Sequence, residues 1–248
     1  MPKSKCSIKS QIQRARLQLA QVSDAPELDA TWLMLHVLGR DESSWLQIHG
    51  ENKLNPEEER QYAELVKRRN TGEPLAYILG YWEFYGRKFL VNKDVLIPRP
   101  STENLVDAVL AKLHKGMVVA DVGTGSGCVI ITLALELANF QFSIFNFQLL
   151  ATDISDAALK IAKENAELHG VADKIEFIRG DMMEALKNIK IDLIVSNPPY
   201  VPTKEILPFE PALALNGGKD GQYFIRQIKA SGIPAIVEGM GGKINFYT

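Results

Sequence analysis

The sequence has few of the residues that mark secreted, metal-binding or membrane-spanning proteins. Among 248 residues there are only two cysteines, Cys6 and Cys128, too few and too far apart for a disulfide framework or a cysteine-rich metal site. Uninterrupted apolar runs stay well short of the roughly 18 residues that a transmembrane helix needs. We therefore expect a protein of the reduced cytoplasmic compartment that is not inserted in a membrane and holds no metal.

The sequence also lacks a marked excess of positive or negative charge. The chain carries 28 Lys and Arg against 30 Asp and Glu, a formal net charge of -2. Without a basic field, attraction to a nucleic-acid backbone is weak, so we expect no direct nucleic-acid substrate. The run Lys67-Arg68-Arg69 is a local exception that leaves an RNA or protein contact open. The N-terminal segment, free of acidic residues up to Asp24, fits either a first helix or a transit peptide.

Residues 1–74 have the pattern of a small helical bundle. Asp24 and Glu27 are spaced as a capping box, and we expect a helix to begin there. Asn55 followed by Pro56 predicts a second helix start of the same kind. This region shows no catalytic signature.

The pattern changes to aromatic and β-branched residues in 75–100, which predicts a β-hairpin connector, and then to alternating strands and helices in 101–248. Alternation of this kind predicts a parallel, doubly wound α/β sheet with ligands at the carboxyl ends of its strands. The expected strands are 117–122, 147–153, 174–180 and 191–196.

The segment ADVGTGSGCV, residues 120–129, carries the first of the candidate binding residues. An apolar strand ends in Asp121, and three alternate glycines then lead the chain into a helix. Glycines allow close approach of a ligand to the backbone at a helix N-terminus. No Lys-Ser/Thr pair follows, so this is not a nucleoside-triphosphate loop, and Cys128 stands where a dinucleotide fingerprint needs glycine. Taken alone, the segment fits a ligand site or a simple tight turn.

The other strands also end in polar residues. The second ends in Asp153, the third in Asp181-Met182, and the fourth in SNPPY, residues 196–200. Each acid taken singly fits a helix cap or a solvated turn. Because parallel strands place their carboxyl ends on one rim of the sheet, we expect these residues to lie side by side around a shared ligand site.

This arrangement resembles the S-adenosylmethionine-dependent methyltransferases, and NPPY is similar to the signature of the branch that methylates planar amino groups. Further segments resemble the release-factor glutamine methyltransferases, the HemK family, and the likeness covers most of residues 10–225. These segments are LDATWLMLHVLG (28–39), RRNTGEPLAYILGYWEF (68–84), VLIPRPSTE (95–103) and FEPALALNGGKDG (209–221).

The resemblance implies a Rossmann-like class I methyltransferase sheet behind an N-terminal helical bundle, residues 1–74, that recognises the substrate. It also implies methyl transfer from S-adenosylmethionine to the glutamine side-chain amide in the GGQ motif of peptide-chain release factors. The implied cofactor residues are Thr102, Asp121, Val122, Gly123, Thr124, Gly125, Asp153, Asp181, Met182 and Asn197. The implied catalytic residues, which would hold the substrate glutamine, are Asn197, Pro198, Pro199 and Tyr200.

The chemistry of an amide accounts for the SNPPY segment. A carboxamide nitrogen offers only N–H donors, so a site that orients it needs acceptors. The side-chain oxygen of Asn197 and the backbone carbonyl of Pro198 supply two, and Tyr200 would stack on the amide plane. Orientation of this kind contributes up to ~7–11 kcal/mol in well-aligned systems.

Three features depart from the family pattern. Ser101 stands where the family usually has Glu, which predicts one charge fewer near the cofactor. Residues 138–148 contain four Phe, which predicts an extra strand or a sticky hairpin. The final GGKINFYT, residues 241–248, is expected to be a fifth strand with the family's terminal hairpin missing after it.

Two other functions stay open on the sequence. One is an adenine or guanine amino-methyltransferase acting on nucleic acid, since NPPY would serve it equally well. The other is a catalytically impaired fragment that binds the cofactor without turnover. We expect a monomer in each case.

Overall fold

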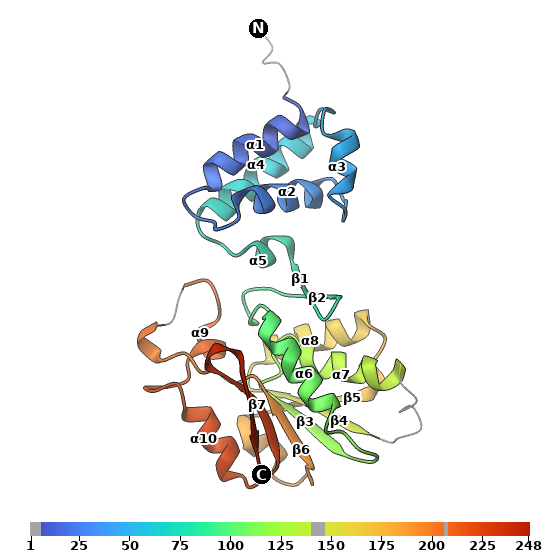
Figure 1. The fold of residues 1–248 in the computed structure, drawn as a ribbon, viewed down its shortest axis with the longest axis vertical. Helices are drawn as coiled ribbons and strands as arrows, with labels where there is room; N and C mark the ends of the chain where they lie inside the picture. Colours follow the sequence, from blue (N-terminus) through green and yellow to red (C-terminus); the bar gives the residue numbers. More distant parts are fainter. Residues whose placement is uncertain (1–5, 140–146, 206–207) are drawn as a thin grey trace. The chain divides into compact units, whose positions relative to one another are not determined.

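The structure is a computed structural model, and it describes residues 6–139, 147–205 and 208–248. It divides into two compact units, Met1–Gly80 and Tyr81–Thr248 (Figure 1). In the described ranges, no helix combines the length and the apolar character needed to cross a membrane. Most of the Phe-rich segment, residues 140–146, lies outside the described residues.

The first unit is built from helices. Its elements are α1 (Ile8–Leu19), α2 (Pro26–Val37), α3 (Ser44–His49), α4 (Pro56–Asn70) and α5 (Leu75–Leu79). The predicted start of α4 is confirmed: the Asn55 side chain accepts from the backbone N–H of Glu58, and the Glu58 carboxylate accepts from the N–H of Asn55. The capping box predicted at Asp24 is wrong. Helix α2 begins at Pro26, so the cap position falls on Ala25, which has no side-chain oxygen.

A buried ion pair ties α2 to α4 inside this unit. Arg69 Nε lies 2.6 Å from Asp29 Oδ2, and the two side chains are 13% and 8% exposed. Tyr62 adds a second link, its hydroxyl donating to the carbonyl of Ala30 at 3.0 Å. Removing one member of a buried pair leaves an unpaired charge, so these contacts fix the register of the two helices.

The region expected to form hairpins begins as a helix, because residues 75–79 form α5, which ends at Gly80 in the left-handed conformation. The hairpin follows as β1 (Tyr81–Phe84) and β2 (Arg87–Leu90), paired antiparallel. The compact units divide at Gly80, whereas the boundary expected near residue 74 stays a prediction.

The second unit contains the expected doubly wound sheet. Its strand order is β5-β4-β3-β6-β7-β8, parallel except for β8. The strands are β3 (Val118–Val122), β4 (Gln148–Asp153), β5 (Ile175–Arg179), β6 (Leu193–Ser196), β7 (Ala235–Gly239) and β8 (Lys243–Tyr247). The chain leaves the β5 edge and returns beside β3, so the topological switch, where such folds bind ligands, lies between β3 and β6.

The expectation that GGKINFYT is the fifth strand of this sheet is wrong. The fifth strand is β7, which pairs parallel with β6, and the segment forms β8, which turns back antiparallel on β7. Gly241 and Gly242, at φ 73° and 74°, make the tight turn between them. That conformation is one that few other residues adopt, and it allows β8 to turn back directly on β7.

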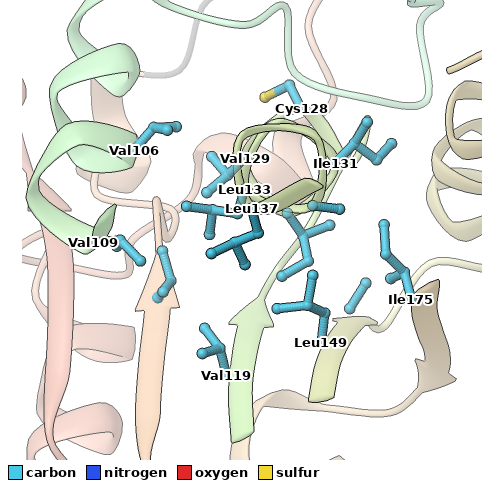
Figure 2. Packing of buried hydrophobic residues seen from close by; sticks show 14 of the residues in the cluster. Val106, Val109, Val119, Cys128, Val129, Ile131, Leu133, Leu137, Leu149 and Ile175 are labelled. Carbon is cyan, nitrogen blue, oxygen red and sulfur yellow. The ribbon is translucent and has the colours of Figure 1, made fainter. Parts of the chain in front are cut away.

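Both faces of the sheet are covered. The remaining elements are α6 (Glu103–Leu110), α7 (Cys128–Asn139), α8 (Asp156–Leu168), α9 (Ala212–Leu215), α10 (Tyr223–Ala230), η1 (Pro100–Thr102), η3 (Ala172–Lys174), η4 (Met182–Leu186), η5 (Thr203–Glu205) and η6 (Met240–Gly242). Neighbouring residues of one strand enter opposite cores: Val119 packs with the α6 and α7 side, and Ala120 with the α10 side. Figure 2 shows the first core, where Val129 and Leu133 of α7 lie over the sheet. Burial on two sides explains why the central strands β3 and β6 are mostly apolar.

Candidate functional site

A pocket of about 380 Å³ lies where the strands of the second unit end, within the range of roughly 300–1,000 Å³ typical of small-molecule sites. The structure brings ten of the predicted site residues together in its wall. They are Thr102, Asp121, Gly123, Thr124, Gly125, Asp153, Asp181, Met182, Asn197 and Pro199. Among the described residues, Val122, Pro198 and Tyr200 are predicted site residues outside that wall.

The glycine-rich turn gives the pocket an open backbone edge. Gly123 and Gly125 have φ of 76° and 56°, and a Cβ built on either would meet nothing within 4 Å. The third glycine differs, because a Cβ on Gly127 would lie 2.8 Å from Ile131 Cδ1. The first two glycines therefore leave room for a ligand, while the third allows two helices to pack.

Asp121 ends β3 as a buried carboxyl group beside this turn. It is 2% exposed, and its Oδ2 accepts from the Thr124 hydroxyl at 2.7 Å. Burial raises the pKa of Asp121 to about 7; the Thr124 bond opposes this rise and the charge of Asp153 adds to it. A carboxyl group poised near neutrality is well suited to a positively charged ligand group, which would favour its ionised form.

Asp153 ends β4 and faces the same space. Its Oδ2 accepts from the backbone N–H of Gly125 at 3.0 Å, and its Oδ1 from that of Ser155 at 2.9 Å. Burial raises its pKa, against the effect of these bonds. Each oxygen keeps a second lone pair, so the carboxylate is held firmly and can still accept from two ligand hydroxyls.

The apolar part of the wall comes from residues after β4 and β5. Met182 lines the pocket at φ 46°, a left-handed conformation that is uncommon outside glycine, beside Asp181. Ile154 lines it too and is 44% exposed, although the sequence did not suggest it. An apolar residue directly after a strand-end acid is the signal that would have found it.

The SNPPY segment ends β6 on the other side of the pocket. Its Ser196 hydroxyl donates to the carbonyl of Val122 at 2.6 Å, which joins the ends of β6 and β3. Asn197 Nδ2 donates to Thr102 Oγ1 at 3.0 Å. Asn197 Oδ1 is buried and has no hydrogen-bond partner among the residues that the structure describes. Tyr200, which follows, has its pKa raised chiefly by burial.

Residues that sequence reasoning missed close the pocket from outside the sheet. Glu210 accepts from the N–H of Ile97 at 3.4 Å and pairs with the Arg99 guanidinium at 2.5 Å, holding two segments of the wall together. Arg99 lines the pocket, as do Tyr223 and Phe224 of α10, and Glu210 supports Arg99 from outside the wall. These residues lie in loops and in α10, where no strand-end pattern marks them.

The residues present fit a nucleoside that carries a cationic amino-acid tail. Two carboxyl groups with raised pKa values face the pocket, and the glycine turn leaves backbone open beside them. Met182 and Ile154 offer apolar surface for a flat ring. The buried amide oxygen of Asn197 remains for a donor of another molecule.

Comparison with known proteins gives two family matches. Residues 11–80 match the PrmC N-terminal domain, and residues 100–208 match the methyltransferase small domain.

Several curated relatives are similar over most of the chain, and the three described here bear the name release factor glutamine methyltransferase. The protein of Nitratidesulfovibrio vulgaris is 41% identical, over 84% of this chain and 70% of its own. That of Geobacter sulfurreducens is 39% identical, over 85% of this chain and 72% of its own. That of Coxiella burnetii is 40% identical, over 90% of this chain and 79% of its own.

Proposed function

This chain belongs to the release factor glutamine methyltransferase family, and we propose that it methylates the glutamine side-chain amide in the GGQ motif of peptide-chain release factors. Its methyl donor is S-adenosylmethionine. When bound, this cofactor supplies an electrophilic methyl group on a positively charged sulfur. The remaining work, holding and aiming the amide nitrogen, falls to the residues of the chain.

The observation that carries the proposal is the unsatisfied oxygen of Asn197. A buried acceptor without a partner is costly, and in a functional site it is explained by a ligand donor. A glutamine side chain brings such a donor in its NH₂ group. Asn197 Oδ1 accepts one N–H, the carbonyl of Pro198 accepts the other, and the nitrogen is thereby oriented.

The cofactor is held chiefly by residues that follow β3, β4 and β5, with Thr102 between it and Asn197. Asp121 and the turn Gly123–Gly125 bind its amino-acid end, and Thr102 lies near that end. Asp153 accepts from the ribose hydroxyls, while Asp181 and Met182 flank the adenine. The geometry supports these roles because all of these residues line one pocket.

The test is methylation in vitro. The full chain is incubated with S-adenosylmethionine and a release factor, and the methylated residue is mapped by mass spectrometry. We expect one added methyl on the GGQ glutamine, and none on a release factor in which that glutamine is replaced by alanine.

The same assay separates the alternatives. Methyl groups on DNA or RNA in place of the glutamine would establish a nucleic-acid amino-methyltransferase and overturn the proposal. Cofactor binding by calorimetry without any methyl transfer would establish the catalytically impaired form. We further propose that the chain acts as a cytoplasmic monomer, which sedimentation and cell fractionation would test.

A further inference from the structure

A second buried oxygen without a partner belongs to Glu238 on β7, which lies near Tyr200 of the SNPPY segment. Glu238 is 0% exposed, and its Oε1 accepts from the Ser101 hydroxyl at 2.6 Å. Its Oε2 is buried without a hydrogen-bond partner among the described residues. Burying a carboxylate that makes one such bond costs stability, so its place beside the site calls for a functional explanation.

Ser101 connects Glu238 to the amide of Asn197 through one neighbouring residue. Ser101 and Thr102 are consecutive in the short turn η1, and the Thr102 N–H donates to the carbonyl of Arg99 at 3.0 Å. Thr102 is 2% exposed, and its hydroxyl accepts from Asn197 Nδ2. A shift of Ser101 therefore moves Thr102, and with it the contact that holds the Asn197 side chain.

The turn between β7 and β8 packs closely against Ser101. A Cβ built on Gly242 would lie 2.6 Å from the Ser101 Cβ. Glu238 thus holds Ser101 by a hydrogen bond while the backbone at Gly242 limits where it can move. The position of η1 is set by residues of β7 and η6, which are remote from it in the sequence.

We propose that Glu238 and Ser101 are positioning residues that fix Thr102 and so orient the Asn197 amide for the substrate glutamine. The proposal rests on the proposed function. Ser101, which stands where the family usually has Glu, donates to a carboxyl group that comes from β7. The role belongs to the hydrogen bond between the two side chains, not to a charge acting on the substrate.

The first experiment separates the hydrogen bond from the charge. Ser101→Ala and Glu238→Ala remove the bond, and each should lower kcat about ten- to a hundredfold, the scale of a misplaced reacting group. Glu238→Gln keeps an oxygen that accepts from Ser101 and should stay within about threefold of wild type. The Kd for S-adenosylmethionine, measured by calorimetry, should change less than threefold in Glu238→Gln and should rise by a smaller factor than kcat falls in the two alanine variants.

A double-mutant cycle shows whether the two residues act as one unit. If both work through their shared bond, Ser101→Ala combined with Glu238→Ala should lower kcat no further than either change alone. Additive losses would overturn the proposal. So would a Glu238→Gln variant as slow as Glu238→Ala with a changed pH profile, because the charge would then be the active feature.

Two glycines of one turn provide a matched steric pair. Gly242→Ala would push Ser101 away, whereas a Cβ on Gly241 would meet nothing within 4 Å. Both glycines have φ near 73°, so the backbone strain of an alanine is shared. We expect Gly242→Ala to lower kcat at least fivefold relative to Gly241→Ala. Equal rates in the two variants would contradict the proposal.

A readout without turnover distinguishes failure of this inference from failure of the proposed function. In the wild-type protein the Asn197 side-chain NH₂ signals in a ¹⁵N NMR spectrum report its bond to Thr102. They should shift in Ser101→Ala and remain in Glu238→Gln. If they do not shift in Ser101→Ala, the positioning role is refuted whatever the wild-type enzyme methylates, and thermal unfolding of each variant verifies that it is folded.

Discussion

The two sides of the pocket differ in how fully the chain satisfies its own polar groups. On the side of β3 and β4, Asp121 accepts from Thr124, and Asp153 accepts from two backbone N–H groups. On the side of β6 and β7, Asn197 and Glu238 each bury an oxygen that lacks a partner among the described residues.

The difference fits two kinds of ligand. Carboxylates already fixed by internal bonds form a rigid surface for a cofactor that binds in every reaction cycle, and the entropic cost of ordering them is met during folding. The amide of Asn197 is fixed at its nitrogen and free at its oxygen. Under the proposed function, a donor of the substrate completes the hydrogen bonding of this amide, which favours a ligand that has one.

Removing the free acceptor should have the largest effect. Asn197→Ala leaves the substrate amide without its side-chain acceptor, and we expect kcat for release-factor methylation to fall about a hundredfold or more. The cofactor Kd should change only a few-fold. Asn197→Asp is the control: one oxygen still accepts from the substrate, the other accepts from Thr102, and the loss should be smaller. Equal losses in both variants would show that the acceptor is not what matters.

The opposite side should respond in cofactor binding. Asp153→Ala removes the acceptor that we propose for the ribose hydroxyls, and we expect calorimetry to show a Kd for S-adenosylmethionine about 10- to 100-fold higher. Asp153→Asn should also raise the Kd, because its NH₂ group would face the backbone N–H of Gly125 or Ser155 in place of an acceptor.

A surface acid on the same strand-to-helix connection provides the control for Asp153. Asp156 pairs with Arg179 and has a side chain that is 70% exposed. Its replacement by Asn removes an equal charge outside the pocket wall and should leave the Kd unchanged. A similar loss in both variants would mean that net charge, not a ribose contact, controls the affinity.

The pH dependence of cofactor binding tests Asp121. With its pKa raised to about 7, this carboxyl group is half protonated near neutrality, and a cationic ligand group binds the ionised form. The Kd should therefore fall as pH rises from 6 to 8, by up to about tenfold per unit below pH 7, and then level off. The raised pKa of Asp153 acts in the same direction. Asp121→Asn should flatten most of this dependence, and a Kd that rises with pH would contradict it.

The raised pKa of Asp121 also affects the stability of the fold, and here the effect of rising pH is unfavourable. Because burial places the folded pKa above its ordinary value of 3.8, Asp121 stabilises the fold most at low pH, and this contribution is lost as pH rises toward 7. Asp121→Asn should raise Tm relative to wild type more at pH 8 than at pH 5, as measured by thermal unfolding without cofactor.

The sequence predicts one side of this comparison better than the other. Asp121 and Asp153 end apolar strands, and parallel pairing brings strand ends together, so local patterns were enough to place them. Strand β7 was missed, and with it Glu238, whose partner Ser101 lies 137 positions away. Glu210 and Arg99 are similarly separated, by 111 positions. Such pairs depend on how whole elements pack, which no local period encodes.

The two kinds of glycine in the 123–127 turn provide the mildest test. Gly123 and Gly127 share a positive φ, so alanine strains the backbone at both, but only at Gly127 does its Cβ crowd Ile131 and Ala162. Overpacking typically costs 1–3 kcal/mol, so Gly127→Ala should lower the free energy of unfolding by about 1 kcal/mol or more beyond Gly123→Ala in urea denaturation. Gly123→Ala should instead raise the cofactor Kd, since its Cβ occupies open space at the pocket wall. If both variants lost stability and cofactor affinity to the same extent, the two glycines would have the same role. That result would contradict the assignment of Gly123 to ligand binding and of Gly127 to helix packing.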